Sequence, residues 1–544
     1  MIEKISQETQ WRKRREITPE KEEIARIVLE EVRNGLDVLL AIRRHPLPSG
    51  GHISKGILVA IYWEGVREGE WDADLTFLRK IRKKPMRSLS GVTTVTVLTR
   101  PQACPGKCIF CPDDVRMPKS YLPDEPAAAR ALQSQFDPFV QVENRLRALQ
   151  NVGHPTDKIE VLILGSSWDA YPIDYREWFV KRCFDALNDV DSESLDEAHH
   201  KNETAQHRNV GLTIETRPDM ITPTSILHMR KLGVTRVQLG VQSLDDSILE
   251  LNHRGHNINR ALEAVAMLRA AGFKIVLHWM PNLLGATPES DIEDFARLWQ
   301  PASEGLGFCP DELKIYPTQL LENTVLYDRW KAGEYHPYTT KQLINLIAEI
   351  KPTIPHYCRL NRVIRDIPSN HVVEGNKRTS LRQDVVQELK IRGQHCSCIR
   401  CREVRGDKLN PDELKMIAEI YYPASAEEHF LEFVTEDDKL AGFLRLSFPN
   451  PDQDLTWRDK FFPDLKDAAI IREIHVYGQS LKVGGEQNGA AQHIGLGTAL
   501  IEEAVKLSKI RGYQRLAVIS AIGTHRYYAK RNFKKGESYM IRDI

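Results

Sequence analysis

The stretch Cys104-Pro105-Gly106-Lys107-Cys108-Ile109-Phe110-Cys111 decides how this chain is expected to fold. It follows directly on the β-branched run 95–100, VTVLTR, which predicts a strand. Three cysteines in one short loop can bind three irons of a [4Fe–4S] cube and leave the fourth iron open. A zinc knuckle is the alternative interpretation, but it needs a fourth ligand nearby, and the sequence around the loop offers none. The spacing therefore predicts an iron–sulfur cluster with one free coordination site.

Outward from this loop, short strand-like runs alternate with longer helical stretches. Strand alternating with helix predicts a parallel sheet, and about six repeats suit an incomplete barrel. The predicted fold class is α/β, with a partial (β/α)6 barrel. The strand-like runs are residues 92–99, 159–165, 209–217, 236–243, 274–281 and 312–318.

Several polar residues stand where these predicted strands end. Gly165-Ser166-Ser167 ends the second run, Glu215 and Arg217 end the third, and Gln242 ends the fourth. Ligands of barrel enzymes bind at this rim, so these residues are candidates for binding a cofactor. Taken one at a time, a plain turn or a structural ion pair explains each of them as well.

Two lysines lie inside predicted strands. Lys274 shares one strand face with His278, and Lys314 stands between apolar residues. A lysine that faces a barrel lumen is costly unless it meets an anion or a hydrogen-bonding ligand. A lysine that reaches solvent at the end of a strand is an equally good interpretation.

The last third of the chain has a different pattern. Strand-like runs at 427–435, 441–448 and 468–478 precede a helical run that begins near residue 494. Gln492-His493-Ile494-Gly495-Leu496-Gly497-Thr498 matches the pyrophosphate loop of GNAT-type acetyltransferases, where backbone N–H groups at a helix start bind phosphate. An acetyl-CoA-binding α/β domain is therefore expected. Its further candidate ligand contacts are Glu473, Ile474, His475, Val476, Tyr527 and Tyr528.

A second group of cysteines lies between the two predicted catalytic parts. Cys396, Cys398 and Cys401 fall within six residues, and with Cys309 they make a four-thiolate set suited to structural zinc. His395 is the rival fourth ligand. Reduced thiols without a metal are the remaining interpretation.

Composition sets the outer limits. The 544 residues are 41% hydrophobic and 28% charged with zero formal net charge, as in a multidomain globular protein. The expected domains are a helical, basic N-terminal region (1–80), the barrel (81–390), a zinc-binding linker (391–412) and the acetyltransferase-type domain (413–544). No signal peptide or transmembrane run is visible, so a cytoplasmic protein without a membrane partner is expected.

Basic residues gather at two places near the start of the chain. Residues 79–87 contain six lysines and arginines without an acid, and residues 12–15 form an earlier cluster. A solvated basic face is the default interpretation of each.

Taken together, the motifs resemble a known family. The Cys-x3-Cys-x2-Cys spacing, with Phe110 before the last cysteine, is typical of the radical S-adenosylmethionine (SAM) superfamily. From about residue 83 to 544 the chain resembles the catalytic subunit of Elongator. The motifs that carry this resemblance are IETRPD (214–219), GVQS (240–243), ELKIYPT (312–318), REIHVYG (472–478) and AVISAIGTHRYYAKRNF (517–533).

The resemblance implies a tRNA-modifying enzyme. In this family a SAM-derived radical activates the methyl group of acetyl-CoA, which adds to carbon 5 of the wobble uridine, and hydrolysis leaves 5-carboxymethyluridine. The anticodon stem-loop of tRNA is the implied partner, with the basic N-terminal stretch contacting phosphates. The implied catalytic residues are Lys158 at the acetyl-CoA channel, Lys274 and Lys314 near the uridine, and His475 and Tyr528.

Two other functions remain open at this stage. The C-terminal part alone would fit a protein lysine acetyltransferase, and a non-catalytic tRNA-binding scaffold would use the cluster only to shape the fold. The electron donor, partner subunits and a homodimer are also left open by the sequence.

Overall fold

The computed structural model describes residues 16–84, 90–405, 409–450, 452–477 and 495–544. It forms two compact units: residues 1–93 with 143–158, and residues 94–142 with 159–544. The domain boundaries expected at residues 80, 390 and 412 stay predictions. Within the described ranges, no helix combines the length and the apolar character needed to cross a membrane.

The first unit contains the expected helical module. Each described helix before residue 82 begins at a side chain that accepts hydrogen bonds from backbone N–H groups of its first turn, as Asp37 does from Leu39 and Leu40. Val28, Leu58 and Tyr62 are fully buried in its core. The helices are α2 (Pro19–Arg33), α3 (Val38–Arg44), α4 (Lys55–Arg67) and α5 (Leu75–Ile81).

The second unit contains a parallel sheet whose strands follow one another in chain order, with parallel registers from β3 to β7. This confirms the incomplete barrel. The sheet has a seventh strand, β7, beyond the six expected runs. The sequence did not predict this strand because its four residues are mostly polar and form no apolar run. The strands are β1 (Thr93–Leu98), β2 (Lys158–Leu164), β3 (Arg208–Thr216), β4 (Arg236–Gln242), β5 (Lys274–Trp279), β6 (Glu312–Ile315) and β7 (Arg359–Arg362).

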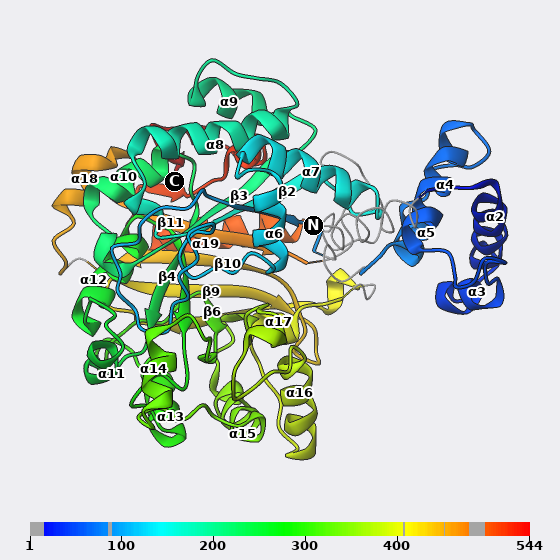
Figure 1. Cartoon of the computed structure of the whole chain (residues 1–544). Helices are drawn as coiled ribbons and strands as arrows, with labels where there is room; N and C mark the ends of the chain where they lie inside the picture. Colours follow the sequence, from blue (N-terminus) through cyan, green and yellow to red (C-terminus); the bar gives the residue numbers. More distant parts are fainter. Residues whose placement is uncertain (1–15, 85–89, 406–408, 451, 478–494) are drawn as a thin grey trace. The chain divides into compact units, whose positions relative to one another are not determined.

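Helices connect these strands, and several lie along the outer side of the sheet in Figure 1. Thr222, Thr287 and Thr339 each begin a helix with a reciprocal capping box, which satisfies N–H groups that the helix leaves unbonded. The helices are α6 (Pro126–Gln133), α7 (Pro138–Gln150), α8 (Ile173–Asn188), α9 (Leu195–Asn202), α10 (Pro223–Lys231), α11 (Asp246–Leu251), α12 (Ile258–Ala270), α13 (Pro288–Arg297), α14 (Val325–Lys331), α15 (Thr340–Ile350), α16 (Leu381–Ile391) and α17 (Ile399–Arg402).

The C-terminal part forms a mixed sheet in the order β13-β14-β12-β11-β10-β9-β8. Leu444, Ile471 and Leu500 belong to its buried core, where helix α19 packs on the sheet. The expected acetyltransferase-type order of strands and helix is confirmed, and β8, β13 and β14 are additional strands. The elements are β8 (Lys415–Tyr421), β9 (Ala426–Val434), β10 (Leu440–Pro449), α18 (Thr456–Phe461), β11 (Ala468–Val476), α19 (Leu496–Ile510), β12 (Arg515–Val518), α20 (His525–Ala529), β13 (Lys534–Lys535) and β14 (Met540–Asp543).

Buried ion pairs join the two sheets. Asp311, just before β6, accepts a 2.9 Å hydrogen bond from Arg472 of β11 and lies 3.5 Å from Arg445 of β10. Burial alone raises the pKa of the Asp311 carboxyl, but these arginines together with Arg269 hold it below its usual value. Removing one member of such a buried set leaves an uncompensated charge, so the pairs constrain how β6 meets the mixed sheet.

Candidate functional site

The three cysteines of the cluster loop line one cavity at the C-terminal ends of the parallel strands. The cavity and the open solvent at its mouth together contain about 560 Å³ of space. Gly165, Ser166 and Ser167 after β2, Glu215 and Arg217 at the end of β3, and Gln242 at the end of β4 complete much of its wall. The structure therefore brings together all the residues that the sequence predicted for a cluster and SAM.

A buried arginine that the sequence reasoning did not assign to the site lies against this loop. Arg254 donates a 3.3 Å hydrogen bond from Nη1 to Sγ of Cys108, and its Nε donates to the carbonyl of Gly240. A hydrogen bond from Cys111, together with the charges of Arg254 and Arg217, lowers the pKa of the Cys108 thiol. The surroundings thus favour the thiolate at Cys108, the form that binds iron, whereas the hydrogen bond with Cys108 and burial raise the pKa of the Cys111 thiol.

Glycine at position 106 is required by the same packing. A Cβ atom there would lie 2.2 Å from Nη1 of Arg217. Arg217 is held in place by Asp219, whose Oδ1 accepts from Nε at 2.9 Å, and by the carbonyl of Arg254. The guanidinium therefore has no free direction in which to yield to a larger side chain.

Two polar atoms at the cavity lack hydrogen-bond partners within the described chain. They are Oε1 of Gln242 and Nη1 of Arg217, and both are buried. Buried polar atoms are normally satisfied, so this pair marks a place where a bound group supplies the missing partners. The residues therefore fit a cluster and a polar cofactor at this cavity.

The turn after β2 is shaped by its neighbours. Gly165 has φ of 150°, and a Cβ atom there would lie 1.9 Å from Oγ1 of Thr99. The hydroxyl of Ser166 donates to the carbonyl of Gln102, and that of Ser167 lies 3.9 Å from Sγ of Cys104. The turn is thus tied directly to the loop that carries the cysteines.

Polar side chains also fill the lumen below the cavity. Oε1 of Gln238 lies 3.0 Å from Nε2 of His278 and accepts a hydrogen bond from the ammonium of Lys314. Because this oxygen can only accept, Nε2 of His278 carries the proton and Nδ1 is the acceptor, 3.9 Å from Oε1 of Glu215. Burial lowers the pKa of His278 well below its usual value and raises that of Glu215. The imidazole is therefore neutral.

Lys274, a second expected catalytic lysine, does not share this location. Lys274 begins β5, and its Nζ lies 2.6 Å from Glu312 and pairs with Glu473 of β11. It is thus part of the buried contact between the two sheets. Lys158 is the first residue of β2 and lies at the boundary between the two compact units.

The predicted acetyl-CoA residues divide between the faces of β11. Gln492 lies outside the described residues, whereas Gly495 precedes α19 with φ of 78°. A Cβ atom on Gly497 would lie 2.5 Å from Oη of Tyr527 and in contact with Ile474 and Val476. These residues meet at the helix start. Arg531 fixes the arrangement: its Nε donates to Oγ1 of Thr498, and its guanidinium lies 3.6 Å from the ring centre of Tyr527.

The remaining predicted residues of this region have other surroundings. Glu473 alternates to the opposite strand face and pairs with Lys274 and Arg445. His475 lies beside the ring of Tyr477, with ring centres 4.4 Å apart. Tyr528 is 6% exposed in the apolar core, and burial raises the pKa of its hydroxyl. A neutral phenol is therefore the form present at this position.

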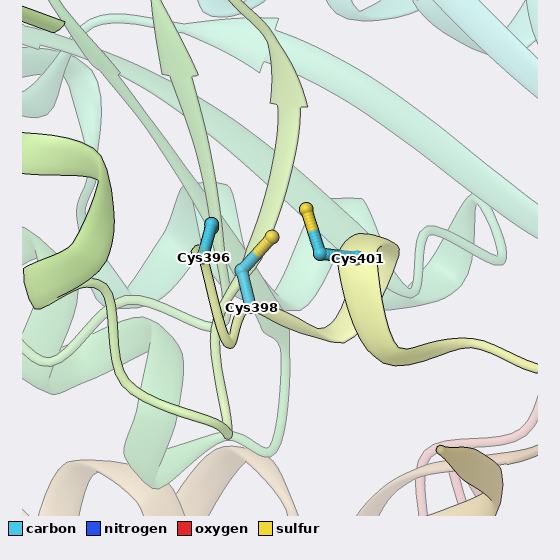
Figure 2. Close-up of side chains that lie close together, drawn as sticks. All are labelled: Cys396, Cys398 and Cys401. Atoms are coloured by element: carbon cyan, nitrogen blue, oxygen red, sulfur yellow. The ribbon is translucent and has the colours of Figure 1, made fainter. Parts of the chain in front are cut away.

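The second cysteine group gathers tightly (Figure 2). The sulfur atoms of Cys396, Cys398 and Cys401 all lie within 4.8 Å of one another. Nζ of Lys351, a buried lysine, is 3.6 Å from the sulfur of Cys401. Cys309 is not in this group: its sulfur lies 3.8 Å from the carbonyl oxygen of Gln300. The structure therefore brings together three of the four predicted zinc ligands.

Comparison with known proteins agrees with this geometry. Family models of the radical SAM superfamily and of the Radical_SAM C-terminal domain match residues 98–298 and 310–391. The chain is 43% identical over 466 residues to the tRNA uridine(34) acetyltransferase of Dehalococcoides mccartyi, covering 85% of this chain and 100% of that protein. It is 36% identical to Elongator complex protein 3 of Drosophila melanogaster, with 87% of each covered. The solved structure of Methanocaldococcus infernus Elp3 with an N-terminal deletion aligns at a TM-score of 0.71 and 35% identity, covering 84% of this chain and 100% of that one. The chain therefore belongs to the radical SAM superfamily and, within it, to the family of Elongator complex protein 3 and the tRNA uridine(34) acetyltransferases.

Proposed function

We propose that this chain modifies the wobble uridine of tRNA, using SAM and acetyl-CoA to form 5-carboxymethyluridine. The observation that carries the proposal is the single cavity that collects the cysteine loop, the Gly165–Ser167 turn and the unsatisfied atoms of Gln242 and Arg217. Similarity to proteins named tRNA uridine(34) acetyltransferase over 85% of the chain supports the substrate.

At the cavity, Cys104, Cys108 and Cys111 hold the cluster, and Arg254 stabilises the Cys108 thiolate by its hydrogen bond. When bound, the cluster and SAM supply a 5′-deoxyadenosyl radical. The backbone of Gly165–Ser167 and the side chains of Gln242 and Arg217 are available to hold SAM.

In the lumen, Lys314 is the residue that we assign to the uridine. Its side chain is buried, donates a hydrogen bond to Gln238, and its charge offsets part of the rise in the pKa of Glu215. The ammonium has further N–H groups that can donate to a uracil carbonyl. Gln238 orients both Lys314 and the neutral His278. Lys274 acts instead by joining the two sheets through Glu312 and Glu473, so we assign it a positioning role.

Acetyl-CoA binding belongs to the start of α19. Gly495 is exposed directly before the first turn of α19, and a helix N-terminus favours phosphate. The hydroxyl of Tyr527 and the side chains of Ile474 and Val476 lie next to Gly497 in the first turn of α19. Tyr528 and His475 stay candidates for contacting the thioester of acetyl-CoA. Lys158 stays the candidate residue for the acetyl-CoA channel.

For the second cysteine group we propose zinc. Tetrahedral zinc with Zn–S bonds of about 2.3 Å places thiolates about 3.8 Å apart, compatible with sulfurs that lie within 4.8 Å. Cys396, Cys398 and Cys401 supply three ligands. His395 directly precedes Cys396 in the chain and is exposed, although its ring nitrogens do not lie within 4.8 Å of all three sulfurs. It is the better candidate for the fourth ligand, because Cys309 packs against backbone carbonyls.

For tRNA we propose contacts with the basic N-terminal stretch. Lys80, Lys83 and Lys84 are exposed and available to phosphates. Arg82 is only 5% exposed, and burial lowers its pKa to about 10. We therefore expect Arg82 to pack within the helical module rather than to contact phosphates. Arg87 and residues 12–15 lie outside the described residues.

The decisive experiment is an anaerobic assay with reconstituted protein, SAM, acetyl-CoA and an anticodon stem-loop. We expect 5′-deoxyadenosine to form only when both acetyl-CoA and RNA are present, and 5-carboxymethyluridine to appear on nucleoside mass spectrometry. A protein lysine acetyltransferase or a non-catalytic scaffold produces neither. Failure to detect both products with cluster-loaded protein would reject the proposal.

A further inference from the structure

The strand β8 forms one edge of the mixed sheet and pairs with β9 on its inner side only, as far as the described strands show. Met416 is 37% exposed, Ile417 42% and Ile420 46%, so both faces of the strand carry exposed apolar side chains. Its register with β9 runs from Lys415 to Tyr421 without a bulge. A long, regular, apolar edge is a template for another strand unless a partner covers it.

We propose that β8 pairs antiparallel with β8 of a second copy of this chain, about a two-fold axis that passes through Ile417. Such an isologous contact uses the same patch on both copies, so the strand has to be complementary to itself. With the axis at Ile417, the facing pairs within residues 414–420 are Leu414 with Ile420, Lys415 with Glu419, Met416 with Ala418, and Ile417 with its own counterpart, while Glu413 faces Tyr421 at each end.

The pairs within residues 414–420 are well matched chemically. Apolar residues face apolar residues, and the one cation faces the one anion on each side of the axis. Facing residues in an antiparallel pair have Cβ atoms about 4.5–5.5 Å apart, so each of them interacts directly with its counterpart. By symmetry the Lys415–Glu419 pair occurs twice in the dimer, and the paired backbone groups extend the sheet into the second copy.

Neighbouring registers lose this match. Facing residues of two strands related by a two-fold axis must lie on the same face of the sheet. The pairing can therefore shift only by two residues at a time, which moves the axis by one residue along the strand. Moving the axis to Met416 places Glu413 opposite Glu419. Moving it to Ala418 places Ile417 opposite Glu419 and Lys415 opposite Tyr421. The Ile417 register is therefore favoured over both.

Arg402, Arg445 and a backbone hydrogen bond from Tyr357 already favour the charged form of Glu419, but one oxygen of its carboxylate has room for a further hydrogen-bond donor. Its Oε2 is buried and makes no hydrogen bond within the described residues. Burial and the neighbouring Glu432 raise the pKa of the Glu419 carboxyl to about 7. Lys415 is exposed in the single chain. A Lys415 from the second copy would bring positive charge to the edge where the carboxylate lies.

Sedimentation velocity of the full chain over about a hundredfold range of concentration tests the proposal. We expect a monomer–dimer equilibrium in the wild type. Lys415→Glu alone and Glu419→Lys alone each turn two attractive pairs into two repulsive ones, and should weaken dimerisation by about tenfold or more. The double variant Lys415→Glu/Glu419→Lys restores the opposite charges and should recover the wild-type dissociation constant.

Lys341→Glu, on the exposed start of α15, is the matched control for a change of net charge and should leave dimerisation unchanged. A wild type that stays monomeric at the highest concentration would overturn the proposal, as would a dimer that neither single variant weakens. If both single variants weaken the dimer but the double variant does not recover it, the Ile417 register is wrong. Thermal unfolding of each variant shows whether a loss of dimer reflects a loss of fold.

Discussion

The two cysteine triads differ in how closely their sulfur atoms gather. Those of Cys396, Cys398 and Cys401 all lie within 4.8 Å of one another, as binding to a single ion requires. In the part of the chain that the structure describes, the cluster-loop cysteines form no such group and instead line a cavity with room for more atoms. A cube takes each thiolate at a different corner, whereas one ion draws all of them to one centre.

The surroundings of the triads differ as well. Lys351 approaches Cys401 at 3.6 Å in the described structure, and Cys401 itself is exposed, while Arg254 approaches the buried Cys108 at 3.3 Å beside an open cavity. Both triads thus have a buried cation that offsets thiolate charge, but only one leaves space for a substrate. The same residue type therefore supports a structural site in one place and a reactive site in the other.

The largest expected effect is a loss of one metal but not of the other, which distinguishes the two cysteine triads. Cys108→Ala should reduce bound iron from about four atoms per chain to fewer than one, because two thiolates cannot hold the cube. SAM cleavage should fall by about a thousandfold or more, while zinc stays bound. Iron and zinc analysis with a 5′-deoxyadenosine assay measures this. Cys183→Ala, buried in α8, is the control and should retain both metals. Equal loss of zinc and iron would contradict two independent sites.

The second largest effect is expected for the corresponding substitution in the other cysteine triad. Cys398→Ala should remove zinc and lower the unfolding temperature by about 10 °C, since a metal bound only by the folded state contributes its binding free energy to stability. Iron content should stay near that of the wild type. Ser397→Ala, between two of the ligands, is the control, and calorimetry with metal analysis is the measurement. Unchanged zinc in Cys398→Ala would exclude this triad as the zinc site.

A smaller effect tests the cation at the reactive triad. Arg254→Gln should make the midpoint potential of the cluster more negative by about 60 mV, a tenfold change for one electron, because the reduced cluster carries more negative charge and loses a nearby cation. Redox titration followed by electron paramagnetic resonance measures this. Arg254→Lys, which keeps the charge, should lie between the wild type and Arg254→Gln. A potential that is the same in all three proteins would exclude electrostatic tuning by Arg254.

The smallest effect concerns Cys309. Cys309→Ser should keep zinc at the wild-type level and destabilise the fold by about 1 kcal/mol, the cost of placing a more polar atom in a buried position. Metal analysis and denaturant unfolding provide the test. Loss of zinc in this variant would show that Cys309 is a zinc ligand. The zinc site would then contain a cysteine from outside the triad.

The sequence alone determined the elements whose signals are local. The loop of Cys104, Cys108 and Cys111, the strand–helix alternation and the glycine that precedes α19 each depend on neighbouring residues, and the described structure has the loop at a cavity, the alternation, and Gly495 at the start of the helix. Strands β7 and β8 were not expected. β7 has four mostly polar residues, and β8 carries apolar residues on both of its faces, so it lacks the alternation of apolar and polar residues that predicts a half-buried strand.

The tertiary structure alone decided which distant side chains meet. Arg254 reaches Cys108 from 146 positions away along the chain, and Lys274 pairs with Glu473 across 199 positions. It also placed Cys309 apart from the other three cysteines. The reason is physical: residue spacing defines geometry only within one loop or element, whereas contacts between elements depend on how whole sheets and helices pack to bury their charges and apolar surface.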